Sequence, residues 1–113
     1  MNVARNTAAG PKELRMSKRT AIEAALRRLG PHIPAHELGA IVDHAIDSPG
    51  LKSAAPETAA WLSLVAYVRH VFTEYDELLA AGYDQDSARF FVTAEINDRL
   101  AAWGVRRRLE PGA

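Results

Sequence analysis

The sequence predicts an all-α protein, a compact bundle of four to five helices with mobile basic termini. Its apolar residues recur at helical spacing in several segments, and Gly-Pro or Pro-Gly signals separate these segments. Alanine, the residue with the highest helix propensity, occupies 21 of the 113 positions. No segment shows the alternation of apolar and polar residues that is typical of a strand between hairpin turns. A chain of this length has room for one modest core, and therefore for one domain.

The composition divides the chain into three sections. Residues 1–16 mix small, polar and basic residues without periodicity, which predicts a disordered basic tail. Residues 17–104 contain all the periodic segments, and we expect them to form the single helical domain. Residues 105–113 are rich in arginine and end in Pro-Gly-Ala, which predicts a second disordered tail.

Two helices are expected before residue 50. The first begins at Ser17 or Thr20, because Thr20 and Glu23 have the spacing of a capping box, and it ends before Gly30. The second begins near Pro34, since proline suits the first turn of a helix. Its apolar residues follow the spacing of one buried face: Leu38, Ile41, Val42, Ala45 and Ile46.

The second half of the chain contains the longest apolar pattern. We expect a third helix over residues 57–72, and its small polar surface places it at the centre of the bundle. Thr73 and Asp76 have the spacing of a new helix start, which predicts a break and a short fourth helix ending at Gly82. A single bent helix is the alternative. Asp84 is the predicted N-cap of the last helix.

The formal net charge is zero, but the charges are sorted along the chain. Residues 1–30 carry seven Lys or Arg against two acids, residues 31–105 four against eleven, and residues 106–113 three against one. Basic ends therefore flank an acidic middle. They either fold back on the acidic body or form basic arms that bind phosphates or an acidic partner.

Composition disfavours several classes of protein. The chain has no cysteine, so neither a disulfide nor a thiolate metal site is available, which suits a reducing cytoplasm. No window reaches the ~20 apolar residues of a membrane-spanning helix, and the first residues lack a signal-peptide pattern. We therefore expect a cytoplasmic protein with no membrane partner and no cofactor.

One polar cluster is a candidate site. Arg69 and His70 end the third helix, and a break at Thr73 would turn Tyr75 and Asp76 back towards them. A histidine beside a carboxylate at a helix C-terminus is stabilised as the cation. A structural role accounts for the same four residues equally well. In that role they cap the helix ends, and the tyrosine hydroxyl makes a hydrogen bond. The sequence favours this structural role over proton transfer, which also needs a pocket.

A metal site is not expected, although histidines and acids gather near residues 32–44. Pro34 separates His32 from His36, so the two do not share one regular helical turn, and Glu37 does not lie between two helix-borne histidines as in zinc hydrolases. We interpret His36 and Glu37 as solvated residues of a first helical turn. The chain also lacks a Gly-x-Ser-x-Gly elbow and a phosphate-binding glycine loop, so an enzyme is the less favoured class.

Several short motifs resemble a known family. In chain order they are Ile33-Pro34, Asp43-His44-Ala45, Tyr67-Val68-Arg69-His70, the run from Thr73 to Leu79, Gly82, Ala88-Arg89 and Trp103. With these motifs, residues 43–104 resemble the bacterial and fungal family of uncharacterised conserved domains called domain of unknown function 2293. Members of that family often carry a Gly- and Arg-rich loop between the second and third helices, where this chain has only Pro49-Gly50-Leu51-Lys52-Ser53. The resemblance implies the helical fold and no mechanism.

Three functions are open at this point. The favoured one is a non-catalytic module that contacts another macromolecule, as a protein partner or by self-association, and an exposed apolar patch near Tyr83 or Phe90 is the first place to look. A small enzyme or ligand-binding protein would use a site around His70, Tyr75 and Asp76. Nucleic-acid binding would use the basic ends. Its contacts would be Lys12, Arg15, Lys18, Arg19, Arg27, Arg28, Arg106, Arg107 and Arg108.

Overall fold

The computed structural model describes residues 11–113, with side chains from residue 18 onward, and all the regular elements in this range are helical. The elements are α2 (Pro11–Leu29), α3 (Ala35–Asp47), the 3-10 helix η1 (Pro49–Leu51), α4 (Pro56–Phe72), α5 (Tyr75–Ala80) and α6 (Gln85–Ala102). The predicted all-α bundle of four to five helices is confirmed. Residues 1–10 of the predicted basic tail lie outside the described residues. None of the described helices is long and apolar enough to cross a lipid bilayer.

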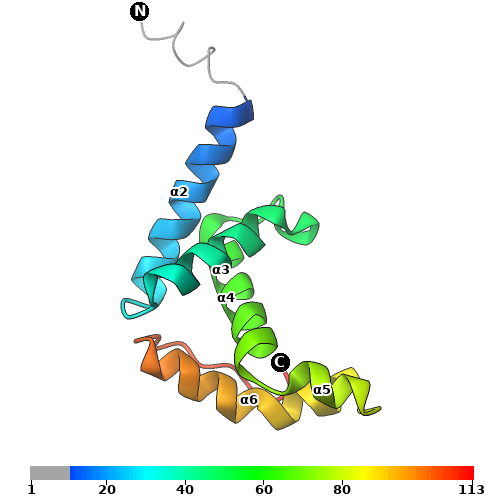
Figure 1. Cartoon of the computed structure of the whole chain (residues 1–113). Coiled ribbons are helices and arrows are strands. Elements are labelled where there is room, and N and C mark those ends of the chain that lie inside the picture. The colour runs from blue at the N-terminus through cyan, green and yellow to red at the C-terminus, as the bar shows by residue number, and fades with distance from the viewer. Residues whose placement is uncertain (1–10) are drawn as a thin grey trace, which may run out of the picture.

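The first helix, α2, begins earlier than the sequence pattern predicts. It starts at Pro11, so Ser17 and Thr20 lie inside the helix and not at its beginning. Proline suits the first position of a helix, and residues 12–19 are mostly residues of good helix propensity. The first turns of α2 extend beyond the rest of the bundle in Figure 1.

Helix α4 is the centre of the bundle, as its apolar pattern predicts. It packs against α2, α3 and α6 and also contacts α5. Figure 1 shows it running from the α2–α3 pair to the layer that α5 and α6 form. Ala59 and Ala60 are fully buried, and these small side chains let neighbouring helices come close. The other buried residues of α4 are Trp61, Ser63, Leu64, Val65 and Val68.

A glycine turn joins the end of α6 to the connection between α2 and α3. Gly104 has a φ of +79°, and a Cβ at this position would lie 3.1 Å from both His32 Nδ1 and Pro31 Cδ. Only glycine fits this conformation without strain or a close contact. The His32 N–H donates to the Trp103 carbonyl oxygen at 3.0 Å, which fixes the turn against the α2–α3 connection.

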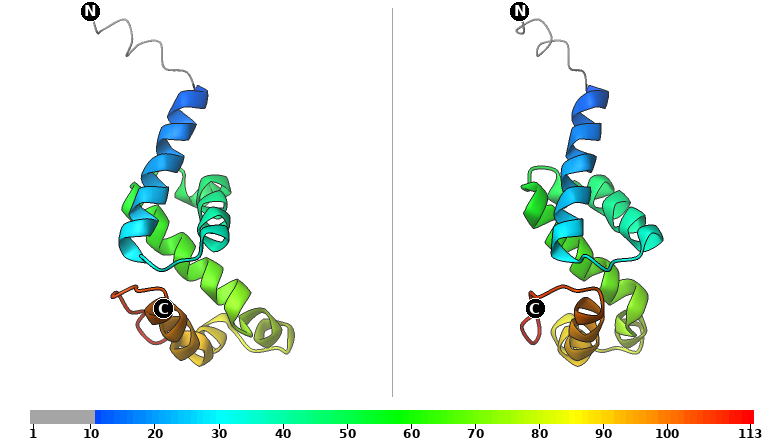
Figure 2. Two further views of the ribbon diagram at one scale, coloured as in Figure 1. Left: turned by 60° about the vertical axis from the view of Figure 1, so that its left-hand side comes forward. Right: turned by 90° about the vertical axis from the view of Figure 1, so that its left-hand side faces the viewer.

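Residues 105–113 run back beside α6 (Figure 2), which differs from the disordered tail that their composition predicts. The Asn97 side chain makes two hydrogen bonds with the backbone of Leu109. Its Nδ2 donates to the Leu109 oxygen at 3.0 Å, and its Oδ1 accepts the Leu109 N–H at 2.7 Å. The Gly112 N–H donates to Thr93 Oγ1 at 3.2 Å. Polar groups on the buried face of α6 therefore bind the segment, together with the buried side chain of Val105.

A side-chain hydrogen bond joins α3 to α4. Tyr67 Oη donates to Glu37 Oε1 at 2.6 Å, and only 13% of the Glu37 side chain is exposed. The interpretation of Glu37 as a solvated residue is therefore wrong. Burial, this hydrogen bond and the charge of Glu37 together raise the pKa of Tyr67 to about 12.

The free energy of unfolding should fall at alkaline pH because of Tyr67. The folded protein holds the phenol proton more tightly than the unfolded chain, so the stabilisation is complete below pH 10 and is lost as the pH approaches 12. Urea denaturation across this range should show the fall in the wild type and a smaller fall in Tyr67→Phe. The exposed Tyr83 provides the control, since Tyr83→Phe should behave as the wild type. An unchanged pH dependence in Tyr67→Phe would contradict the assignment.

Candidate functional site

The four residues of the predicted polar cluster meet at the break between α4 and α5. Helix α4 ends at Phe72, Thr73 is extended, and α5 begins at Tyr75, so the break is found and the single bent helix is not. Thr73 Oγ1 donates to the Arg69 carbonyl oxygen and accepts the Tyr75 N–H at 3.1 Å. One hydroxyl thus satisfies backbone groups at the end of one helix and the start of the next.

The exposed half of the cluster is the pair His70 and Asp76. His70 Nδ1 and Asp76 Oδ2 lie within ion-pair distance, and the two side chains are 72% and 49% exposed. Water and salt screen such a pair, which stabilises a protein by about 1 kcal/mol or less. The pair is therefore open to bulk water, unlike the water-excluded groups that enzymes use for proton transfer.

The less exposed half of the cluster is the partly buried Arg69 and the buried Tyr75. Tyr75 is 8% exposed, and the Arg69 Cζ lies 5.6 Å from the centre of its ring. Arg69 Nη2 also donates to the Ala113 oxygen at 2.9 Å. Burial and then the charge of Arg89 lower the pKa of Arg69, and Tyr75 opposes this change. These contacts attach the junction to the C-terminal segment.

The first two basic residues of α2 with described side chains are engaged within the molecule. Lys18 Nζ donates to the carbonyl oxygens of Leu51 and Lys52 at 3.2 and 2.6 Å, where η1 ends. Arg19 pairs with Asp43 of α3 at 2.6 Å. Both side chains therefore stabilise the packing of α2 against the segment that follows it.

The last two basic residues of α2 also have acidic neighbours. Arg27 pairs with Glu23 one turn earlier at 3.7 Å, and Arg28 pairs with Glu57 of α4 at 3.2 Å. The side chains of Lys12 and Arg15 lie outside the described residues. Lys18, Arg19 and Arg28 thus contact the rest of the bundle, as the first of the two alternatives for the basic ends expects, whereas Arg27 pairs within its own helix.

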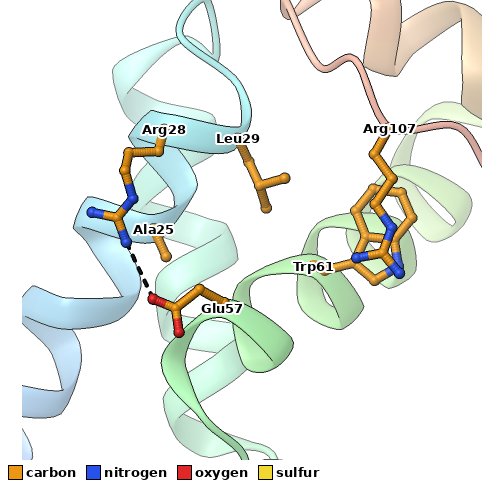
Figure 3. A pocket seen from close by; sticks show the side chains of 6 residues that line it. All are labelled: Ala25, Arg28, Leu29, Glu57, Trp61 and Arg107. Atoms are coloured by element: carbon orange, nitrogen blue, oxygen red, sulfur yellow. Dashed lines mark hydrogen bonds and ion pairs between the residues drawn. The ribbon is translucent and has the colours of Figure 1, made fainter.

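The C-terminal arginines do not all lie in one place. Arg106 and Arg107 line one hollow with Arg28, at the end of α2, whereas Arg108 lines another beside Phe90 of α6. In Figure 3 the Arg107 guanidinium lies over the Trp61 ring, with 4.0 Å between its Cζ and the ring centre. Arg28, at the end of α2, therefore lies in the same hollow as Arg106 and Arg107 of the C-terminal segment.

Three exposed rings form an aromatic patch, defined as Tyr83, Phe90 and Phe91. These residues are 47%, 61% and 55% exposed. The ring centres of Tyr83 and Phe91 are 5.6 Å apart and those of Phe90 and Phe91 are 6.1 Å apart, both edge to face. An open hollow of about 600 Å³ extends from Phe90 to Leu109 and Pro111 of the C-terminal segment. Exposed apolar groups gathered in this way are typical of interaction surfaces.

The histidines and acids near residues 32–44 do not form a metal-binding group. Among the residues with described side chains, no three His, Asp or Glu are close enough to hold a metal ion. His36 Nε2 lies 3.8 Å from Glu37 Oε1, and this oxygen accepts the hydrogen bond from Tyr67.

The family described as Uncharacterized conserved protein (DUF2293) matches residues 25–104. The chain belongs to this family. The match confirms the resemblance indicated by the motifs and begins further towards the N-terminus, in the second half of α2. No curated protein and no solved structure matches the chain.

The family match separates the candidate surfaces into two groups. The α4–α5 junction and the aromatic patch lie within the matched residues 25–104 of the DUF2293 family. Arg106 and Arg107 lie beyond them, in the segment that Gly104 turns towards α2. The hollow that these arginines share with Arg28 is thus built partly from the family region and partly from the segment after it.

Sequence patterns do not reveal several residues of these surfaces. Glu57 reads as an ordinary acid in the first turn of a helix, and Trp61 as a core residue. Their partners, Arg28 and Arg107, lie 29 and 46 positions away. Phe91 is adjacent to the expected Phe90, and its exposure becomes evident only from the packing of α6.

Loss of the Thr73 hydroxyl should weaken the α4–α5 junction. We expect Thr73→Val to lower the free energy of unfolding by about 1–2 kcal/mol, because the Arg69 oxygen and Tyr75 N–H lose their shared partner. Thr73→Ser keeps the hydroxyl, so its loss of unfolding free energy should be less than about half of the loss in Thr73→Val. The exposed His70 provides a second comparison, since His70→Ala should change the stability by about 1 kcal/mol or less. Urea denaturation measures all three, and equal stabilities of Thr73→Val and Thr73→Ser would contradict this role.

Proposed function

We propose that the chain is a non-catalytic helical module that binds another protein through the aromatic patch, and that this protein is a second copy of the chain. The observation that carries the proposal is the exposure of Tyr83, Phe90 and Phe91 on one small domain. Aromatic residues are enriched in protein interfaces, where they contribute large apolar areas with few rotatable bonds. Contact with a partner would remove these rings from water.

The charge pattern supports a particular arrangement of two copies. Residues 75–102, which contain α5 and α6, carry six acids against two arginines, whereas α2 carries six Lys or Arg against two acids. Two copies that met patch to patch would bring acidic surfaces together, which is unfavourable. A contact between the α2 of one copy and the α5–α6 layer of the next would pair opposite charges.

The shape of the molecule allows this head-to-tail contact. The first turns of α2 and the α5–α6 layer lie at opposite ends in Figures 1 and 2. Each copy can therefore offer one surface to the copy before it and the other to the copy after it. Contacts of this kind generate rings or open chains.

The α4–α5 junction fits a module without catalysis. Thr73, Arg69 and Tyr75 are engaged in contacts that join helices, and the His70–Asp76 pair is open to water. These contacts provide a reason for the four polar residues that requires no substrate.

Self-association should depend on concentration, salt and the aromatic patch. Size exclusion with light scattering should detect dimers or larger species at ~50 mM salt and fewer at ~500 mM, because salt screens the opposite charges. We expect Phe90→Ser to raise the dissociation constant about tenfold or more, since it removes an exposed ring from the contact. Leu62→Ser is the matched control, because Leu62 is 47% exposed on α4 and lies outside the patch.

Three outcomes would contradict the proposal. A strict monomer at ~1 mM protein would exclude a stable second copy. Association that strengthens with salt would indicate the patch-to-patch arrangement of like charges. Equal effects of Phe90→Ser and Leu62→Ser would show that any exposed apolar residue contributes as much as the patch.

A further inference from the structure

A basic groove lies on a different part of the surface from the aromatic patch. It consists of two adjoining hollows, of about 240 and 410 Å³, that share Arg28, Leu29 and Arg107. The end of α2, the start of α4 and the chain after Gly104 form its walls. In Figure 3, Arg28 and Glu57 lie on one side of the first hollow, Arg107 and Trp61 lie on the other, and Leu29 lies between them.

The groove has more positive charge than its own acid can balance. Arg28, Arg106 and Arg107 contribute three guanidinium groups, and Glu57 contributes one carboxylate. Glu57 pairs with Arg28 at 3.2 Å, and both side chains are more than half exposed. Among the described residues, no ion pair is found for Arg106 or Arg107. An exposed pair is weak, so Arg28 can exchange Glu57 for another anion at little cost.

The groove also offers a flat surface for a planar group. Arg107 is exposed and its Cζ lies 4.0 Å from the centre of the Trp61 ring, while Trp61 itself is only 7% exposed. The indole therefore supports one face of the guanidinium and leaves the other face to the solvent. Guanidinium planes stack on nucleic-acid bases in the same manner as aromatic rings do.

The backbone holds these groups in place. The positive φ of Gly104 and the hydrogen bond from His32 to Trp103 fix the point at which the chain leaves α6. Val105, the next residue, is 6% exposed and anchored in the core. Arg106 and Arg107 thus follow an anchored residue, which reduces the entropy lost when they bind a ligand.

We propose that the basic groove binds a nucleotide with an unpaired base, either free or within a single strand. Arg28 and Arg106 bind the phosphate, because guanidinium groups donate paired hydrogen bonds to its oxygens. The base stacks on the outer face of Arg107, over Trp61. This activity goes beyond the proposed self-association, since Trp61, Arg106 and Arg107 belong neither to α2 nor to the aromatic patch. Base-paired DNA should bind more weakly, because its bases are already stacked on one another and only its phosphates are available to the groove.

Fluorescence anisotropy of a labelled single strand of ~10 nucleotides at ~50 mM salt tests the proposal. We expect binding, competition by unlabelled nucleoside monophosphate at higher concentration, and weaker binding of a duplex of the same sequence. Arg106→Ala should lower the affinity about five-fold or more and reduce the slope of log affinity against log salt by about 0.7. Arg107→Lys keeps the positive charge but removes the planar guanidinium group. It should therefore lower the affinity for the single strand more than the affinity for the duplex.

Two matched controls use residues of the same kind outside the groove. Arg27 is adjacent to Arg28 in the chain and pairs with Glu23, so Arg27→Ala should leave the affinity within about two-fold of the wild type. Glu57→Gln should increase the affinity about two-fold or more, because it removes the carboxylate that competes for Arg28. Glu23→Gln should not. A gain in affinity cannot result from misfolding, so this comparison remains decisive if an arginine variant is unstable.

Any of four results would overturn the proposal. The first is no binding of the single strand at ~50 mM salt, and the second is equal affinity for the single strand and the duplex. The third is an equal loss of affinity in Arg27→Ala and Arg106→Ala. The fourth is that Glu57→Gln gains no more affinity than Glu23→Gln. Self-association of Arg106→Ala and Arg107→Lys should be unchanged, because these two residues belong neither to α2 nor to the aromatic patch, and this separates the inference from the proposed function.

Discussion

Burial of α4 between the two halves of the molecule is the constraint on which the rest of the structure depends. The chain has no cysteine, so its stability comes from packing. Leu64 and Val68 of α4 are fully buried, and α2, α3 and α6 all pack against this helix. Each of these three helices has an apolar face that would be exposed without α4. Their positions, and those of the polar groups that they carry, therefore depend on this one helix.

The same helix sets the separation between the candidate surfaces. Its first turns carry Glu57 and Trp61, which contribute to the basic groove with Arg28 and Arg107. Its last turn carries Arg69 and continues through Thr73 to the α5–α6 layer and the aromatic patch. The residues of the groove and those of the patch therefore lie at different ends of α4. The two proposals together describe a module that joins a second copy of itself to a nucleotide ligand.

Local signals in the sequence predict local structure well. The break at Thr73 and the Asp84 cap are both found, the latter with the Ser87 N–H donating to Asp84 Oδ1 at 2.7 Å. These features depend on residues within one helical turn of each other. The Asn97 contacts with Leu109 span 12 positions, and the Arg28–Glu57 pair spans 29, so no local pattern indicates them. The same limit explains why an Arg-rich, Pro-Gly segment was expected to be disordered when distant polar groups bind it.

Native-state hydrogen exchange of the backbone amides tests the central position of α4 most directly. We expect the amides between Leu64 and Val68 to exchange only by global unfolding, with the same free energy that urea denaturation gives for the whole domain. The short helix α5 and the segment after Gly104 should exchange through smaller local openings. If the α4 amides exchanged at a lower free energy than those of α3 or α6, α4 would not be the helix on which the fold depends.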